Sequence, residues 1–238
     1  LPICKYLDSG NEARIKKAYE SRDPRLQMAV ITPYAQYNGA SSGIAHTYTL
    51  RWPYRGSDSA EPFDIRTDTN DKFYYLWRKF VPEGLEQTER DTYGLDIPLI
   101  RYAEVLLLKA EALNEWGSTH ESEAIRCVNE VRRRAGHVEL NNATYPATKV
   151  NGQSDLRERI RNEYYWEIGG EDSMYFHELR WGTWKDKKFD NNRNGLMQMW
   201  GETTYTWYWL GDQCWSWPIP AKEMEMNSNL EQNEGWIN

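Results

Sequence analysis

The fold is decided by the stretch Pro98-Leu-Ile-Arg-Tyr-Ala-Glu-Val-Leu-Leu-Leu-Lys-Ala-Glu-Ala-Leu-Asn-Glu-Trp-Gly117. Apolar side chains recur in it three or four positions apart, at Leu99, Tyr102, Leu106, Ala110 and Leu113. This spacing predicts an amphipathic helix with one apolar stripe. Pro98 suits the first turn of such a helix, and Gly117 suits the position after its last turn.

A second helix is predicted directly after the first. Apolar positions recur at helical spacing from Ala124 to Ala135, and Ser118 with Glu121 predicts a capping box at its start. The run 132–134 is three arginines in the last turn, where cations meet the negative end of the helix dipole, and its simplest interpretation is a solvated helix end. The short connection makes the helices antiparallel neighbours, so 97–136 is a hairpin of tetratricopeptide-like size.

Six motifs that occur in order along the chain resemble those of the SusD/RagB family. They are Arg22-Asp-Pro-Arg-Leu26, Arg78-Lys-Phe80, the central block of 101–115 with 124–136, the segment 160–171, Glu178-Leu-Arg-Trp-Gly182 and the closing segment 217–236. Each motif alone is weak. Six of them in the right order, from about residue 20 to residue 236, make the resemblance specific.

The resemblance implies a mainly α fold, a SusD-like helical (tetratricopeptide-like repeat) body with long aromatic-rich loops and a few short strands. Family members are outer-membrane nutrient-binding lipoproteins. The resemblance therefore implies cell-surface binding of a glycan or oligosaccharide without catalysis, and its delivery to a SusC-like TonB-dependent transporter. We expect 1–238 to be the C-terminal SusD-like domain, with the lipid anchor on a missing N-terminal part.

Within this domain, three further kinds of segment are expected. A second helical hairpin is predicted over 154–186, where Asp155 with Glu158 indicates a capping box and apolar residues step by four along the helix. Loop or strand excursions are predicted over 34–77 and 195–217, which are rich in aromatic residues. A short strand is expected over Gln27–Pro33.

The composition excludes several classes of function. A formal net charge of −7 argues against nucleic-acid binding, which depends on cationic contacts to phosphate. No apolar run approaches the roughly 20 residues of a membrane-spanning helix. The three cysteines give neither a disulfide framework nor zinc-ligand spacing, so no metal or cofactor is expected. The 12 Trp and 16 Tyr against 5 Phe favour half-exposed surfaces that bind amphipathic ligands such as sugars.

The segment Tyr34–Thr69 is the least regular part of the chain, yet it is rich in aromatic residues, unlike disordered segments. We expect an ordered binding loop; the alternative is that its aromatic side chains only anchor the loop to the helices. The predicted glycan-binding residues are Trp52, Tyr54, Tyr48, Tyr34 and Tyr37, with Trp207 and Tyr208 from the second excursion.

Catalysis finds little support in the sequence. The four histidines are scattered, and no nucleophile or nucleotide-binding motif is present. Glu163 and Glu167 lie one helical turn apart and resemble a glycosidase pair, but we expect them to be surface charges or partners of Arg159 and Arg161. A helical glycoside hydrolase or lyase, and a protein-binding helical repeat module, remain the alternatives.

Overall fold

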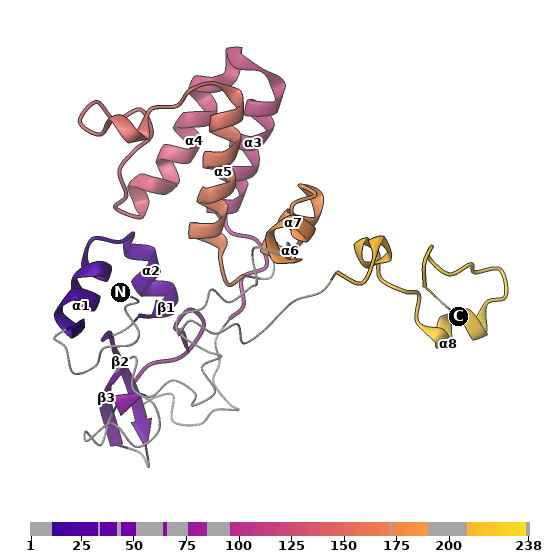
Figure 1. The fold of residues 1–238 in the computed structure, drawn as a ribbon, viewed down its shortest axis with the longest axis horizontal. Coiled ribbons are helices and arrows are strands. Elements are labelled where there is room, and N and C mark those ends of the chain that lie inside the picture. Colours follow the sequence, from indigo (N-terminus) through magenta and orange to yellow (C-terminus); the bar gives the residue numbers. More distant parts are fainter. Residues whose placement is uncertain are drawn as a thin grey trace. The chain divides into compact units, whose positions relative to one another are not determined.

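The computed structural model describes residues 11–32, 34–41, 44–50, 64–65, 76–84, 96–171, 173–189 and 209–236 (Figure 1). It divides into two compact units, Leu1–Met174 and Tyr175–Asn238. Predicted residues Trp52, Tyr54, Trp207 and Tyr208 lie outside the described ranges. None of the described helices is long and apolar enough to cross a membrane.

Three helices lying side by side form the body of the first unit (Figure 1): α3 (Tyr102–Trp116), α4 (Glu121–Arg134) and α5 (Gln153–Ile168). The predicted mainly helical fold is confirmed. Small Ala110 and Ala124 are fully buried and let the backbones approach. The remaining core consists of aliphatic side chains with one tyrosine and one thiol: Leu106, Leu107, Leu113, Ile125, Cys127, Val128, Val131, Leu156, Ile160, Tyr164 and Ile168.

The first predicted helix begins later than its apolar pattern indicates. Arg101 is extended (φ −114°, ψ 149°) and precedes α3, so Leu99 lies outside the helix and is 88% exposed. Tyr102 is also exposed, and Leu107 takes a place in the buried stripe instead. Pro98 is therefore a residue of the approach to the helix, not of its first turn.

Neither predicted capping box forms as expected. Ser118–His120 is a short 3₁₀ turn, so α4 begins at Glu121 with His120 before it and no side-chain cap. Helix α5 begins two residues before Asp155, and the Asp155 carboxylate reaches back to accept a hydrogen bond from the Asn151 N–H (2.9 Å). Asp155 thus satisfies an amide ahead of the helix without being its N-cap.

Two short helices precede the body: α1 (Asn11–Glu20) and α2 (Pro24–Ala29). The predicted strand at 27–33 is wrong in its first half, because Asp23 caps α2 and Pro24 occupies its first turn. Only Val30–Ile31 is extended; it forms β1, which pairs antiparallel with β5 (Leu76–Trp77).

The segment taken from sequence as irregular contains a hairpin. Strand β2 (Gln36–Ser41) pairs antiparallel with β3 (Ile44–Leu50), in a register that joins Tyr37 to Tyr48, and β4 (Asp64–Ile65) lies parallel to the end of β3. Alternating β-branched and aromatic residues in β3 suit a strand.

Short elements complete the chain. Pro146–Thr148 is a 3₁₀ turn between α4 and α5, and α6 (Ser173–Arg180) follows α5. The second unit also contains α7 (Trp184–Phe189), the 3₁₀ turn Asp212–Trp215 and α8 (Ala221–Met226). Gln232 fixes the closing segment, because its side-chain amide accepts from the Ile219 N–H (2.7 Å) and donates to the Ile219 carbonyl (2.9 Å).

Candidate functional site

One face of the β2–β3 hairpin is aromatic. Tyr37 and Tyr48 are directly opposite in the antiparallel register, as are Gly39 and His46, so all four positions share this face. Both tyrosine rings lean over Gly39, where an added Cβ would stand 2.8 Å from Tyr48 Cε2 and 3.0 Å from Tyr37 Cε1. The His46 ring meets Tyr48 edge to face at 6.1 Å. Only glycine leaves room for this arrangement.

The outer edge of β2 is held by the segment 78–84. The Tyr37 hydroxyl donates to the Pro82 carbonyl (2.7 Å), and the Glu83 carboxylate accepts from the Asn38 N–H (3.0 Å). Arg78 in turn donates to both oxygens of Glu83, at 2.5 and 3.0 Å. Burial opposes the charged form of Glu83, but the Arg78 hydrogen bonds hold its pKa below the usual value. Tyr37 is therefore partly an anchor of the hairpin.

Beside the hairpin lies an open hollow of about 500 Å³. Its lining is mostly polar and comes from α1, α2, β2 and the segments around them: Lys16, Tyr19, Glu20, Gln27, Thr32, Tyr34, Ala35, Gln36, Asn38 and Arg78. Tyr34 has a positive φ of 65°, uncommon for a bulky residue, and its ring lies 5.2 Å from the Lys16 ammonium. We call this hollow the Tyr34 pocket.

The structure separates the predicted tyrosines into two groups. Gln36 and Asn38 line the Tyr34 pocket, whereas the intervening Tyr37 points to the opposite face of the strand together with Tyr48. Of the predicted tyrosines that the structure describes, Tyr34 is thus in the pocket, and Tyr37 and Tyr48 are not. The sequence analysis missed the polar lining residues, because Gln36 and Asn38 gain a common face only once the segment is recognised as a strand.

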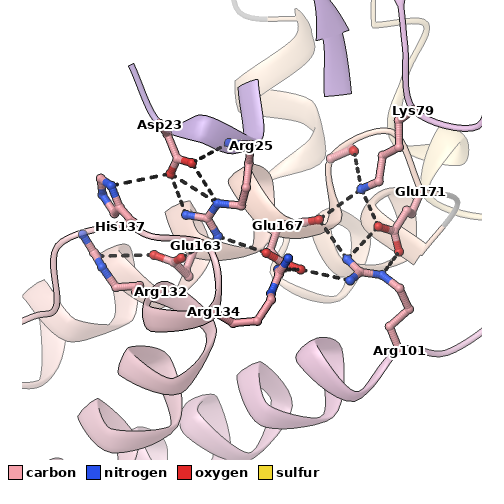
Figure 2. A network of polar contacts seen from close by, with 11 residues as sticks. Asp23, Arg25, Lys79, Arg101, Arg132, Arg134, His137, Glu163, Glu167 and Glu171 are labelled. Atoms are coloured by element: carbon pink, nitrogen blue, oxygen red, sulfur yellow. Dashed lines mark hydrogen bonds and ion pairs between the residues drawn. The ribbon is translucent and has the colours of Figure 1, made fainter. Parts of the chain in front are cut away.

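A second polar centre joins motifs that are far apart in the sequence (Figure 2). Arg25, on α2, is bound to Asp23 and reaches α5, where its Nη1 donates to Glu163 Oε1 (2.8 Å) and to Glu167 Oε2 (3.1 Å). Arg132, at the end of α4, lies 3.3 Å from the second oxygen of Glu163. Glu163 is completely buried, so these cations compensate a charge removed from water.

The same helix end is held by three further cations (Figure 2). Arg101 donates to Glu167 Oε1 (2.9 Å) and forms a fork with both oxygens of Glu171 (2.9 and 2.7 Å). Lys79 contacts Glu171 Oε1 (2.5 Å) and the carbonyls of Glu167 and Gly169. Arg134 donates to Glu167 as well. We call this set of charges the α5 ion network.

A protein-family model with the description "SusD family" matches residues 6–236 of the chain. The chain belongs to the SusD family. Starch-binding protein SusD of Bacteroides thetaiotaomicron is 28% identical over 161 residues, which are 67% of this chain and 25% of that protein. SusD-like protein P38 of Formosa agariphila is 32% identical over 139 residues, 58% of this chain and 24% of that protein.

Solved structures of SusD-like proteins show the same fold. One from Bacteroides fragilis has a TM-score of 0.61 at 22% identity and is matched over 92% of this chain and 40% of its own. A SusD homologue from Bacteroides thetaiotaomicron has a TM-score of 0.54 at 23% identity, over 90% and 41%. Among the curated relatives described above, the chain spans about a quarter of the length of each. The family resemblance seen in the motifs is confirmed.

The α5 ion network corrects two predictions. Arg132 is buried and Arg134 binds Glu167, so the end of α4 is not simply solvated. Glu163 and Glu167 are also buried and do not pair with the two nearby arginines of their own helix; Arg159 pairs with Asp155, and Arg161 with Glu158. The error arose because spacing along one helix reveals local partners only.

The electrostatics of the network suit a structural role. Burial raises the pKa of Glu163, although the charges of Arg25 and Arg132 oppose the shift. Burial also favours protonation of Glu167, but hydrogen bonds from Arg101 and Arg25 hold its pKa below the usual value. Both carboxylates are enclosed by guanidinium groups, which leaves them poorly placed for acid–base chemistry on a substrate. In the described part of the chain, no group of three His, Cys, Asp or Glu side chains is placed to hold a metal.

Proposed function

We propose that this SusD-family chain contributes to non-catalytic binding of a glycan at the cell surface. The observation that carries the proposal is the match to the SusD family over residues 6–236. One of the similar curated proteins is named for starch binding. The Tyr34 pocket supports it, because an aromatic ring beside amide, hydroxyl and charged groups suits a sugar, which has C–H faces and hydroxyl edges.

In this proposal the Tyr34 pocket and the loop that follows the hairpin form one binding surface. The Tyr34 ring stacks on a sugar face, and Gln36 and Asn38 hydrogen-bond to hydroxyl groups. Trp52 and Tyr54, whose positions follow the end of β3, supply further aromatic contacts, and Tyr48 and Tyr37 extend the surface on the other face of the hairpin. Trp207 and Tyr208 are secondary candidates.

We further propose that the bound oligosaccharide is delivered to a SusC-like TonB-dependent transporter in the outer membrane. The protein is held at the cell surface by a lipid anchor, and this chain acts as the C-terminal SusD-like domain, with helical hairpins at 97–136 and 154–186. The buried, arginine-bound state of Glu163 and Glu167 supports binding without cleavage, because these two carboxylates were the best glycosidase candidates in the sequence.

Isothermal titration of the purified chain against soluble plant, host and microbial polysaccharides tests the proposal, with product analysis in the same samples. Binding of one polysaccharide class without release of shorter products is the expected result. Release of shorter products would replace the proposal with a hydrolase or lyase. Absence of binding both by this chain and by the full-length protein that contains it would reject glycan recognition.

A further inference from the structure

A second hollow, of about 280 Å³, lies where α2 and the segment 79–80 meet the ends of α4 and α5. It is separate from the Tyr34 pocket: the two share no lining residue. One part of its wall is apolar and is formed by Met28, Ala29, Phe80, Pro98 and Trp166. The other part is charged and belongs to the α5 ion network: Arg25, Lys79, Arg101, Arg134, Glu167 and Glu171.

Most cations around this hollow already have their hydrogen-bond partners. Lys79 has three contacts, one to Glu171 and two to backbone carbonyls, which matches its three N–H donors. Arg101 contacts both Glu167 and Glu171 through all three of its nitrogens. Such groups contribute positive potential to the hollow but offer few free donors.

Arg134 differs from them. Its side chain is 58% exposed, and within the described residues its only ion-pair partner is Glu167, which it contacts through one terminal nitrogen. A guanidinium carries five N–H donors in a planar fork, so one edge of Arg134 remains available while the other holds Glu167. A fork of this kind recognises planar or tetrahedral oxyanions through paired hydrogen bonds.

The charge balance favours an anion at this position. Within the α5 ion network, five cationic side chains (Arg25, Lys79, Arg101, Arg132 and Arg134) face four carboxylates (Asp23, Glu163, Glu167 and Glu171). The hollow itself is lined by four of the cations and only two of the carboxylates. Water and salt screen charges less inside the hollow than at the open surface, so its excess positive charge attracts an anion more strongly.

We propose that this hollow binds a small organic oxyanion, a carboxylate or sulfate carried on an apolar body. The open edge of Arg134 binds the oxyanion, the neighbouring cations supply the attractive potential, and the wall that includes Phe80 and Trp166 contacts the apolar body. The site lies apart from the proposed glycan surface, so it can be tested without a glycan and independently of the proposed function.

The experiment is an NMR titration of the isotope-labelled chain at low ionic strength. Three probes separate the contributions: cyclohexanecarboxylate, inorganic sulfate and neutral cyclohexanol. We expect saturable shifts of the Arg134 Nε–Hε and Trp166 indole signals with cyclohexanecarboxylate, weaker binding of sulfate, and no saturable shift with cyclohexanol. If sulfate binds as tightly as the carboxylate, the apolar wall has no part in the site and the proposal fails in that respect.

The neighbouring Arg133 provides a matched control. It is the same residue type on the same helix, is 64% exposed, pairs with Glu139 and does not line the hollow. Arg134→Gln should weaken cyclohexanecarboxylate binding about tenfold, the effect of losing charge-assisted hydrogen bonds, whereas Arg133→Gln should leave it within about twofold. Arg134→Lys should recover part of the affinity, because it restores the charge without the fork.

Glu167 retains Arg25 and Arg101 in the Arg134→Gln variant, so the fold is expected to persist, and circular dichroism verifies it. Equal effects of the two glutamine substitutions would show that net charge alone matters and would overturn the site. Absence of saturable binding of either anion to the wild-type chain would overturn it as well.

Discussion

Arg25 and Glu163 are 138 positions apart in the chain, yet Arg25 Nη1 lies 2.8 Å from Glu163 Oε1. Arg25 is almost entirely buried and Glu163 completely so. The contact therefore fixes α2 against α5 through charges that have lost their water. Because a buried ion left without its partner is costly, this pair makes the position of α2 sensitive to either residue.

Replacement of Arg25 by Gln should destabilise the chain by about 3–5 kcal/mol, because Asp23, Glu163 and Glu167 lose a shared cation in a buried environment. The free energy of unfolding, measured with urea and far-UV circular dichroism, tests this. Arg22→Gln is the control: Arg22 is exposed and donates to the Ala18 carbonyl, so about 0.5 kcal/mol or less is expected. Similar losses in both variants would show that the network contributes little.

Acid should weaken the fold through the same network. Arg25 holds the pKa of Asp23, and Arg101 with Arg25 that of Glu167, below the ordinary 3.8 and 4.5, in spite of burial. The stability they confer is complete above those ordinary values and is lost as the pH falls through the lowered values of the folded state. Glu163 acts in the opposite sense, because burial raises its pKa and its protonation on acidification relieves a cost.

We therefore expect the free energy of unfolding to decline below about pH 4.5, and to decline less steeply in Glu167→Gln, which cannot gain that proton. Chemical denaturation at a series of pH values between 7 and 3 measures both slopes. Glu158→Gln removes an exposed carboxylate from the same helix and serves as the comparison. A Glu167→Gln slope as steep as that of the wild type would assign the acid sensitivity to other groups.

Replacement of Tyr34 by Ala should remove most glycan binding, since its ring supplies aromatic surface among the polar residues that line the pocket. Both residues carry a Cβ and meet the steric cost of φ 65°, so the change mainly removes the ring. Tyr145→Ala, at a 53% exposed tyrosine between α4 and α5, is the control for a general loss of aromatic surface.

Trp52→Ala is expected to abolish sugar binding and to leave the melting temperature nearly unchanged, in agreement with a ligand-binding role predicted from its sequence context. Titration calorimetry and thermal unfolding on the same preparation measure the two effects. A large fall in melting temperature with unchanged affinity would instead identify Trp52 as an anchor of its loop.

The helical body was accessible from sequence because its information is local. Apolar residues three or four positions apart, such as Ala110 and Leu113 or Ile160 and Tyr164, determine which helix face is buried. These residues are buried in the structure. Fold-level assignment also succeeded, since the order of the motifs is itself a sequence property. The start of α3 was misjudged because Leu99 continues the apolar pattern into a segment that is not helical.

The candidate site was less accessible, because it depends on pairings between distant residues. Nothing near Asn38 in the sequence indicates that its N–H binds Glu83, and nothing near Glu163 indicates Arg25. The buried charge network was therefore interpreted as surface charge. The charged residues of the α5 ion network all lie within the sequence motifs. A motif shows that a residue type recurs in a family, but it does not show which partner that residue contacts.

The excursion between α2 and the central body is secured at both ends. Val30–Ile31 pairs with Leu76–Trp77 at its base, while Arg25 before it and Lys79 after it both bind the end of α5. None of these attachments uses a side chain of residues 32–75. We therefore expect the segment between these two attachments to tolerate changes of length and side chain, by evolution or by grafting, while the helical body stays folded.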